Sequence, residues 1–248
     1  MRIIGVYNIK GGVGKTATAV NLAYLAARDG LRTLVWDLDP QGAASFYFRI
    51  KPKVKGGSKK MLRGKKELDE LIKGTDYDRL DLLPADFSYR NMDLVLDETK
   101  KPAMRLLKLL RPLSYEYDLV ILDCPPSISL VSENIFQAAS ALLIPTIPTT
   151  LSLRTYGQLM EFVINNNLER LQLMPFFSMV DRRKRMHQEI TQELPKLHPE
   201  LLKTHIPYAS DVERMGMYRK PLADYAANST AAHAYEELWQ EVKQQVLL

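Results

Sequence analysis

Short continuous apolar segments alternate with longer amphipathic segments along most of the chain. Segments such as RIIGVY (2–7) and YDLVILD (117–123) are apolar almost throughout, which is typical of strands covered on both faces of a parallel sheet. Residues 15–29 instead repeat small apolar side chains at helical spacing and end before Gly30. Repeated units of this kind predict an α/β fold, a doubly wound, mainly parallel sheet flanked by helices.

The same alternation places the remaining elements. We expect strands at residues 2–7, 33–39, 79–85, 117–123, 141–148 and 175–181, with a short strand within 201–208. We expect helices at residues 15–29, 88–110 with an interruption at Pro102, 130–140, 152–166, 183–194 and 229–246. The chain of 248 residues contains no internal repeat and no low-complexity tail, so we expect one domain over 1–248.

Charge is distributed unevenly along this pattern. Residues 49–66 hold nine Lys or Arg and no acid, whereas the formal net charge of the whole chain is only +5. A second basic cluster occupies residues 182–185. Concentrated positive charge favours a polyanionic partner. The alternative for both segments is a solvated loop without a partner, and we treat 49–66 as a basic insertion in the domain.

Composition excludes several classes of protein. The single cysteine, Cys124, cannot form an internal disulfide, which fits a reducing cytoplasm. The chain begins without a charged-then-apolar leader, and no apolar run approaches the ~20 residues of a membrane helix. The four histidines show no metal-ligand spacing. We therefore expect a cytoplasmic protein that does not contact a membrane.

A glycine-rich loop follows the first expected strand, in the stretch YNIKGGVGKTATAVN (7–21). Glycines let backbone N–H groups turn toward phosphate oxygens, and the following helix adds its positive end. Lys15 would reach the β- and γ-phosphates, and the Thr16 hydroxyl would bind Mg²⁺. The general phosphate-loop pattern places a glycine where this chain has Ile9, and it does not require the neighbouring Lys10.

Three aspartates end two of the expected strands. Asp37 and Asp39 close the segment LVWDLDPQG, and Asp123 closes LVILDCPPS. Ligands of doubly wound sheets bind at the carboxyl ends of the strands, where the phosphate loop also lies. Asp123 is at the position of a carboxylate that holds the Mg²⁺ shell. The pattern predicts a metal-dependent phosphoryl site.

KGGVGKT, WDLDPQG and LDCPPS together resemble the ParA/MinD branch of P-loop NTPases, and DPQG resembles the ParA side. The resemblance covers most of the chain and is clearest over 1–45 and 115–150. It identifies the loop as a deviant Walker A motif, in which the extra lysine, Lys10, acts on the nucleotide of a second subunit. It thus implies a homodimer that sandwiches two ATP molecules, with ATP and Mg²⁺ as cofactors.

The resemblance also implies roles for individual residues. Lys10, Lys15 and Asp39 would be catalytic, with Asp39 orienting the attacking water. Thr16, Asp37 and Asp123 would act on the metal. The expected nucleotide contacts are Gly11, Gly12, Val13, Gly14, Lys15, Thr16, Ala17, Asp181 and Pro207. Ala17 is a departure, because the family commonly has threonine there; we expect a modest change in nucleotide affinity.

ParA proteins bind double-stranded DNA without sequence preference, so the resemblance implies a DNA surface. Its expected residues are Arg182, Arg183, Lys184, Arg185, Arg214, Arg219 and Lys220, with 49–66 as a further candidate. The chain has Asp211 near the place where the family carries another arginine, so we expect a rebuilt surface. Lys and Arg contacts to phosphates give binding that weakens steeply with salt.

The resemblance implies a dimerising ATPase that is nucleoid-associated and partitions or positions a cargo through a ParB-like or cargo-adaptor protein. The cargo stays open: a plasmid, a chromosome or a protein assembly such as a carboxysome or chemoreceptor cluster. A MinD-like membrane-cycling ATPase would need a basic amphipathic C-terminal helix, which AYEELWQEVKQQVLL is not. An iron–sulfur carrier would need cysteine pairs. A metabolic P-loop ligase or kinase is the remaining alternative.

Overall fold

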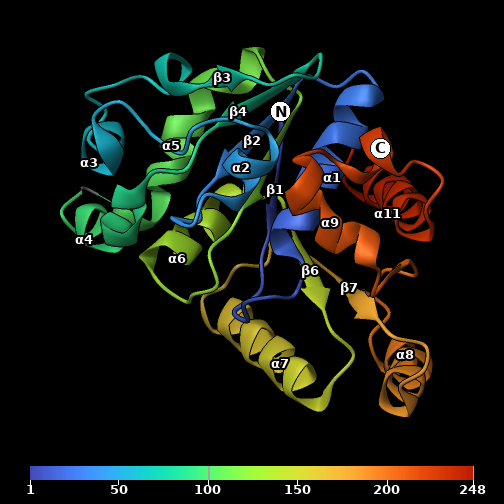
Figure 1. Cartoon of the computed structure of the whole chain (residues 1–248). Helices are drawn as coiled ribbons and strands as arrows, with labels where there is room; N and C mark the ends of the chain where they lie inside the picture. Colours follow the sequence, from blue (N-terminus) through green and yellow to red (C-terminus); the bar gives the residue numbers. More distant parts are fainter. Residues whose placement is uncertain (100, 248) are drawn as a thin grey trace.

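A computed structural model describes residues 1–99 and 101–247 of the chain. Its strands are β1 (Arg2–Val6), β2 (Thr33–Asp37), β3 (Lys73–Gly74), β4 (Leu80–Leu83), β5 (Leu119–Asp123), β6 (Ala141–Thr146), β7 (Gln172–Val180) and β8 (His205–Pro207). Within the described residues they form one sheet in the order β3-β4-β2-β5-β1-β6-β7-β8 (Figure 1). Neighbouring strands are parallel, except that β3 is antiparallel to β4. The predicted doubly wound, mainly parallel sheet is confirmed.

The helices cover both faces of this sheet. They are α1 (Lys15–Arg28), α2 (Ala43–Tyr47), α3 (Gly57–Leu62), α4 (Met92–Asp97), α5 (Arg105–Leu110), α6 (Leu130–Ala138), α7 (Thr150–Asn165), α8 (Arg185–Leu197), α9 (Ser210–Tyr218), α10 (Leu222–Tyr225) and α11 (Thr230–Val246). Short 3-10 turns are η1 (Asp69–Leu71), η2 (Phe87–Asn91), η3 (Pro102–Met104) and η4 (Arg111–Tyr115). Helices α1, α9 and α11 lie on one side of the sheet, and α4, α5 and α6 lie on the other (Figure 1).

Each face of the sheet has its own hydrophobic core. One core joins the sheet to α4–α7 through buried residues such as Leu96, Leu106 and Ile135. The other joins it to α1 and α11 through residues such as Leu22 and Trp239. Because the central strands are covered on both sides, their side chains are apolar at almost every position, which explains why the strands were legible in the sequence.

Strand β1 lies at the centre of the sheet, between β5 and β6. Chain connections leave it toward both edges, because β2 follows on the β5 side and β6 lies on the other. The carboxyl ends of β1, β2 and β5 therefore open on the same edge, next to the loop that joins β1 to α1. This is the switch point at which doubly wound sheets bind ligands.

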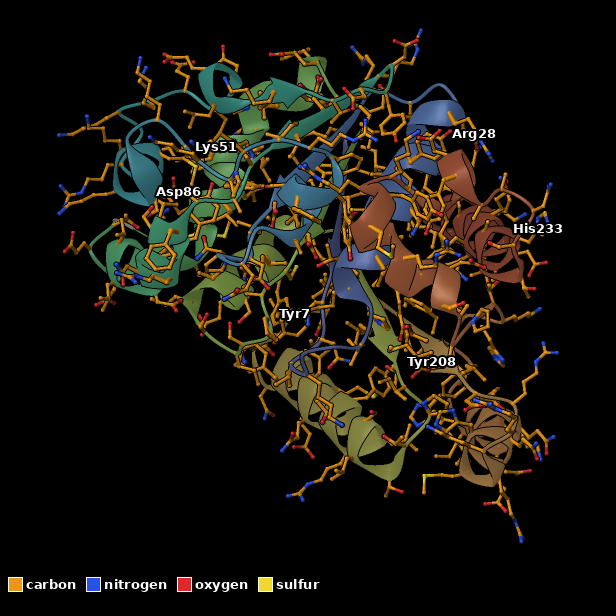
Figure 2. The ribbon with its side chains drawn as sticks, in the orientation of Figure 1. Tyr7, Arg28, Lys51, Asp86, Tyr208 and His233 are labelled. Atoms are coloured by element: carbon orange, nitrogen blue, oxygen red, sulfur yellow. The ribbon has the colours of Figure 1, made fainter. Side chains whose placement is uncertain are left out.

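The basic segment 49–66 is folded, not an unstructured loop. It contains α3, in which Met61 and Leu62 are completely buried. The Val54 N–H donates to Asp86 Oδ2 at 2.8 Å, and Asp86 is labelled in Figure 2. Its lysines and arginines point outward, while its few apolar residues fix the segment to the domain. The alternative of a flexible loop is wrong for this segment.

Two other expectations need correction. Residues 88–110 do not form one helix with a single interruption at Pro102: η2, α4, η3 and α5 follow one another there. Helix α9 was not predicted, and only Met215 among its nine residues is buried. No helix in the described part of the chain is long and apolar enough to cross a membrane.

Candidate nucleotide-binding and hydrolysis site

The loop between β1 and α1 has the backbone of a phosphate cradle. Gly12 and Gly14 adopt φ angles of 71° and 94°, in the left-handed region that favours glycine. A Cβ atom at Gly14 would also lie 3.0 Å from the Ser178 Oγ of β7. No atom of the described residues lies within 4 Å of a Cβ at Gly11. Gly14 is thus required by conformation and by a close neighbour, whereas the space at Gly11 is open.

Helix α1 begins at Lys15, directly behind this loop, and its N-cap Gly14 offers no side-chain cap. The first N–H groups of a fourteen-residue helix therefore face the loop without a side-chain acceptor, as an anion site requires. Lys15 is buried, and its Nζ donates to the Lys10 carbonyl at 2.7 Å. Burial lowers the pKa of Lys15, while the nearby Asp123 carboxylate acts in the opposite direction.

Asp37 and Asp123 face each other at the ends of β2 and β5. They are paired in the parallel register, and both are completely buried. Asp37 Oδ2 accepts from the Ser45 N–H at 2.8 Å and from the Ser45 hydroxyl at 2.7 Å. Asp37 Oδ1 and both Asp123 oxygens have no hydrogen-bond partner in the described part of the chain. Buried acceptors without partners are costly, so this pair fits a cation.

The surroundings of the two carboxyl groups also shift their acidity. Burial raises the pKa of Asp37 to about 6, although hydrogen bonds from Ser45 oppose that shift. Burial, together with the charge of Asp37, raises the pKa of Asp123 well above its usual range, although the Thr16 hydroxyl, which lies near this carboxyl group without forming a regular hydrogen bond, acts in the opposite direction. The described residues contain no group of three or more His, Cys, Asp or Glu side chains placed to hold a metal ion by themselves. Two carboxylates and the Thr16 hydroxyl suit Mg²⁺, which keeps several waters and binds phosphates as its other ligands.

Asp39 lies outside this buried pair. It follows β2 in the loop toward α2 and is partly exposed. Its Oδ1 accepts from the Gln41 N–H at 2.9 Å, and its carbonyl accepts from the Gly42 N–H. The loop is anchored because the Leu38 N–H donates to the Asp123 carbonyl at 3.0 Å. Asp39 is therefore held near Asp37 and Asp123, and its second carboxylate oxygen forms no hydrogen bond within the described residues.

Lys10 is placed at the rim of the loop, away from the buried carboxylates. Its N–H donates to Asn8 Oδ1 at 2.9 Å, and Asn8 is tied to the Pro145 carbonyl of β6. The Lys10 Nζ contacts the Ser152 Oγ of α7 at 3.4 Å. Ser152 is buried and also contacts the Thr149 hydroxyl. The lysine thus rests on α7 through one long hydrogen bond.

Asp181 and Pro207, expected near the adenine, line a common cavity of about 790 Å³ at the ends of β7 and β8. Tyr208 and His233, labelled in Figure 2, line it as well. The Asp181 carboxylate forms an ion pair with Arg183, with Nε and Oδ1 2.9 Å apart. Volumes of this size accommodate small organic ligands. Ala17 lies elsewhere, on α1, and its carbonyl accepts from Asn21 Nδ2.

The basic residues expected to bind DNA fall into two groups. Residues 182–185 form the turn between β7 and the first residue of α8, and all four are exposed. Arg183 pairs with Asp181 and Arg185 with Glu189, whereas Arg182 and Lys184 form no ion pair with any residue that the structure describes.

The second group consists of Arg214, Arg219 and Lys220, and each of these side chains contacts another residue of the chain. The Arg214 Nη2 donates to the Tyr218 hydroxyl at 2.8 Å, and Lys220 pairs with Asp224 at 3.0 Å. The Arg219 Nε donates to the Phe46 carbonyl at 2.9 Å. The charge of Lys220 is thus paired with an acid, whereas Arg214 and Arg219 keep their charge but are held by neutral acceptors within the chain.

Sequence reasoning missed three serines that shape the site. Ser45 holds Asp37, Ser152 contacts Lys10, and Ser178 closes the space beside Gly14. Each comes from a different element, and serine has no local pattern that would distinguish these positions from others. Only the packing of α2, α7 and β7 around the loop identifies them.

Known proteins are similar in sequence to nearly the whole chain. A family described as an AAA domain, AAA_31, matches residues 1–173. The sporulation initiation inhibitor protein Soj of Bacillus subtilis is 31% identical over 247 residues, covering 97% of this chain and 98% of that protein. The chromosome partitioning protein ParA of Myxococcus xanthus is 31% identical over 251 residues, covering 97% and 87% respectively.

Two solved structures resemble the fold. A plasmid partition protein of Borrelia burgdorferi with bound AMPPNP has a TM-score of 0.85 at 23% identity, with 99% of each chain covered. Cobyrinic acid a,c-diamide synthase of Mycobacterium smegmatis, with a bound ATP analog and magnesium, has a TM-score of 0.81 at 25% identity, covering 99% of this chain and 96% of that chain. The first likeness concerns the fold alone.

Proposed function

This chain belongs to the ParA-type family of partitioning ATPases, and on this premise we propose that it is a dimerisation-gated ATPase switch. ATP and Mg²⁺ are its cofactors. The dimer binds nucleoid DNA without sequence preference, and an adaptor on the cargo stimulates hydrolysis and releases it. The observation that carries this proposal is the pair Asp37 and Asp123, whose unpartnered buried oxygens lie beside the phosphate loop.

The phosphate loop binds ATP through its backbone N–H groups and the start of α1. Lys15 leaves the Lys10 carbonyl and pairs with the β- and γ-phosphates. Asp37, Asp123 and Thr16 would hold Mg²⁺, which would neutralise charge on the phosphate oxygens. Asp181 and Pro207 border the adenine in the cavity at the ends of β7 and β8.

Asp39 orients the attacking water in this proposal. Its carboxylate is held by the Gln41 N–H on one oxygen, so the other oxygen can accept a hydrogen bond from water. The loop that carries Asp39 is tied to β5 through Leu38, and this links the water to the metal ligands. Asp39→Ala should then bind ATP and dimerise but hydrolyse it slowly.

Lys10 supplies a cation to the nucleotide of the partner subunit. In the single chain its Nζ has only a long contact with Ser152 at the rim of the loop, so little holds it there. A cation delivered in trans stabilises charge that develops on the transferring phosphoryl group, as an arginine finger does. Hydrolysis therefore requires the homodimer that sandwiches two ATP molecules.

The turn 182–185 is the main DNA surface in this proposal. Arg182 and Lys184 have no competing ion pair in the described residues, so both can contact phosphates. Phosphate contacts of this kind need no base reading, which fits non-specific binding. Arg214, Arg219 and Lys220 are secondary candidates, because each already has a partner within the chain.

The protein acts in the cytoplasm and associates with the nucleoid through this surface. The MinD-like alternative needs a free amphipathic helix at the end of the chain. Helix α11 instead packs in the core through Trp239 and Val242, so it is not available to a bilayer as it stands.

The decisive experiment compares the wild-type protein with Asp39→Ala on immobilised duplex DNA. With Mg²⁺ and ATP we expect both proteins to be retained, and after washing into ATP-free buffer we expect Asp39→Ala to remain bound longer. ADP should support no retention by either protein. Turnover of Asp39→Ala at the wild-type rate would remove this residue from the mechanism, and retention that is independent of nucleotide would contradict the switch.

A further inference from the structure

The short helix α2 holds only one of the two oxygens of Asp37. Asp37 Oδ2 accepts from both donors of Ser45, the N–H at 2.8 Å and the hydroxyl at 2.7 Å. Asp37 Oδ1 is buried and accepts no hydrogen bond within the described residues. Because a carboxylate oxygen can accept from two donors, Ser45 saturates one oxygen and leaves the other open. A buried carboxylate that served only the fold would gain from donors on both oxygens.

We propose that Ser45 is a positioning residue for metal binding, which fixes the Asp37 carboxylate so that Oδ1 stays free for Mg²⁺ or for a water of its shell. The inference rests on the proposed function, because it places a residue behind a proposed metal ligand. Ser45 itself does not touch the metal. Residues behind a ligand orient it, and their loss lowers metal affinity about tenfold or more.

A neighbour from β4 fixes the direction of the Ser45 hydroxyl proton. The N–H of Ala85, just beyond the end of β4, donates to the Ser45 Oγ at 3.0 Å. A hydroxyl has one proton and two lone pairs, so Ala85 occupies a lone pair and the proton is left for Asp37 Oδ2. Ser45 and Ala85 are both completely buried, so bulk water does not compete for these groups. The Ser45 hydroxyl is therefore held as a donor to Asp37.

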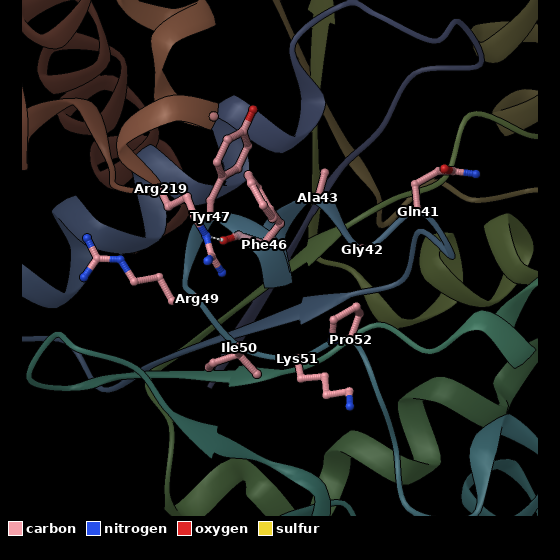
Figure 3. Close-up of a pocket in the computed structure, with 11 residues that line it drawn as sticks. Gln41, Gly42, Ala43, Phe46, Tyr47, Arg49, Ile50, Lys51, Pro52 and Arg219 are labelled. Carbon is pink, nitrogen blue, oxygen red and sulfur yellow. Dashed lines mark hydrogen bonds between the residues drawn. The ribbon is translucent and has the colours of Figure 1, made fainter.

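Helix α2 is itself fixed at both ends. The Arg219 Nε donates to the Phe46 carbonyl at 2.9 Å, and the Arg219 guanidinium lies 4.5 Å from the centre of the Phe46 ring (Figure 3). At the start of the helix, Gly42 adopts a φ of 68°, and a Cβ there would lie 2.9 Å from the Pro52 Cβ. Close contacts at both ends of a five-residue helix leave Ser45 little freedom to move. The fold therefore sets the position of Ser45 without a bound nucleotide.

Capping of α2 is the competing explanation for these contacts. Ser45 is the third residue of α2, and the N-cap Gly42 has no side chain to accept from the first N–H groups of the helix. Asp37 would then act as a distant cap and contribute to stability alone. A cap explains the contact with the Ser45 N–H, but it explains neither the hydroxyl contact nor the open oxygens of Asp37 and Asp123. The two explanations differ in what removal of the hydroxyl does to Mg²⁺ binding.

The residue proposed to orient the attacking water is held by other groups. Asp39 Oδ1 accepts from the Gln41 N–H at 2.9 Å, and the preceding Leu38 N–H donates to the Asp123 carbonyl at 3.0 Å. Neither contact involves Ser45. Loss of the Ser45 hydroxyl should therefore weaken Mg²⁺ binding and leave turnover at saturating Mg²⁺ close to that of the wild-type protein.

The test measures the affinity of the full chain for a fluorescent, slowly hydrolysed ATP analogue, once with Mg²⁺ and once with EDTA. In EDTA we expect the wild-type protein and Ser45→Ala to bind the analogue equally, because the phosphate loop is unchanged. With Mg²⁺ we expect Ser45→Ala to bind it about tenfold more weakly than the wild-type protein. Ser45→Thr keeps the hydroxyl and should bind as the wild-type protein does; a folded Ser45→Thr that binds like Ser45→Ala would contradict the role of the hydroxyl.

Ser58→Ala is the matched control, because Ser58 is equally buried but its hydroxyl donates to the Ser88 carbonyl, at 3.1 Å, and not to a residue of the proposed site. In urea unfolding it should also lose stability, yet it should keep the wild-type response to Mg²⁺. Ser45→Cys replaces Ser45→Ala if that variant does not fold, since a thiol fills the space but donates weakly. A less stable Ser45→Ala with the wild-type response to Mg²⁺ would show that Ser45 only caps α2, and the proposal would fail.

A second measurement follows ATP turnover as the Mg²⁺ concentration is raised. The concentration that gives half-maximal turnover should be higher for Ser45→Ala, while turnover at saturating Mg²⁺ should stay near the wild-type value. Lower turnover at saturation with an unchanged half-maximal concentration would assign Ser45 to the attack of water and overturn its role in metal binding. A wild-type protein that binds the analogue equally with Mg²⁺ and with EDTA would contradict the proposed function itself, and this inference with it.

Discussion

Asp37 and Asp123 are buried at a cost in free energy, because their carboxyl groups lack hydrogen-bond partners for most of their oxygens. Their carboxyl groups are removed from water, and three of the four oxygens have no partner in the described residues. Such groups are retained where function needs them, because an apolar or neutral side chain would be more stable there. We therefore expect the nucleotide-free protein to bind a cation between these two carboxyl groups.

That preference predicts a pH dependence of stability. Burial raises the pKa of Asp37 to about 6, from about 3.9 in an unfolded chain. Between these values the folded protein binds more protons than the unfolded chain, so the free energy of unfolding should fall as pH rises through this window. The shift of about two units limits the effect to about 3 kcal/mol. Urea unfolding of the EDTA-treated, nucleotide-free protein, at pH values from about 4.5 to about 7, measures it.

Asp37→Asn is the reference for this measurement. It keeps an acceptor for Ser45 but cannot ionise, so the fall in stability across the window should be smaller than in the wild-type protein. At the upper end of the window the variant should be the more stable of the two, and it should have lost Mg²⁺-dependent ATP binding. Parallel stability curves for the two proteins would mean that Asp37 does not carry the effect.

The glycines of the phosphate loop make a second residue-scale prediction. Gly14→Ala places a Cβ at φ 94° and 3.0 Å from Ser178 Oγ, so we expect a loss of about 1–3 kcal/mol in the free energy of unfolding. Gly11→Ala is the control, because the described residues leave the space within 4 Å of its Cβ open. Thermal unfolding without nucleotide compares them. Equal effects of the two substitutions would show that Gly14 is not under the constraint described.

At the scale of elements, α3 attaches the basic segment 49–66 to the domain. Nine positive residues in eighteen positions are typical of a solvated loop, but Met61 and Leu62 of α3 are completely buried. A few apolar contacts outweigh the self-repulsion, since exposed charges interact weakly in water. The segment therefore presents its charge from a fixed surface.

Met61→Ala should therefore destabilise the protein by about 2–4 kcal/mol through the cavity that it leaves. The matched control is Leu94→Ala, since Leu94 is 70% exposed on the neighbouring α4 and should change stability little. Limited trypsinolysis provides a second readout, because cleavage in 49–66 should be slow in the wild-type protein and fast in Met61→Ala. Rapid cleavage of the wild-type protein there would contradict the folded segment.

The turn between β7 and α8 is a second element whose charge can be tested. Replacing Arg182 and Lys184 with glutamine should weaken retention on duplex DNA and reduce the salt dependence of binding by about 0.9 in log–log slope for each phosphate that is no longer neutralised. ATP binding should be unchanged. The control exchanges Lys108 and Arg111, two exposed cations near α5, for glutamine. If both double variants lose DNA to the same extent, net charge and not this turn governs retention.

At the scale of the whole molecule, we expect the site to be complete only when two chains meet. One chain brings together the loop, Lys15 and three aspartates, but its Lys10 rests at the rim on Ser152. A site shared between two chains is compatible with the fold. The phosphate loop lies at the carboxyl end of β1, and the two hydrophobic cores lie on the two faces of the sheet. In the proposed mechanism the switch is therefore a property of the assembly.

Lys10→Ala should then bind one ATP per chain with nearly unchanged affinity while losing ATP-dependent dimerisation and turnover. Mass photometry with Mg²⁺ and a slowly hydrolysed ATP analogue measures the dimer, and calorimetry measures binding. Lys59→Ala, an exposed lysine of α3, is the control and should dimerise normally. A Lys10→Ala dimer with wild-type turnover would exclude the trans role.

The sequence by itself determined the sheet, the phosphate loop and the strand-end aspartates. These depend on contiguous residues: apolar runs make buried strands, glycines allow the loop, and strands of one parallel sheet end at one edge. The boundaries of the elements between 88 and 110 were less legible, because α4 and α5 each have only six residues and their short apolar stretches favour no single period.

Only the tertiary structure decided how distant segments complete these features. Ser45 meets Asp37, Ser178 closes on Gly14, and Arg219 lies over Phe46 across 173 positions of sequence. Such contacts depend on the packing of separate elements, and no local pattern of residue types encodes them. The same holds for α3 and α9, where a few buried residues suffice because neighbouring elements supply the rest of the core. The residue types at a strand end can be read from the local sequence. Their hydrogen bonds and neighbours depend on the elements that pack against that end.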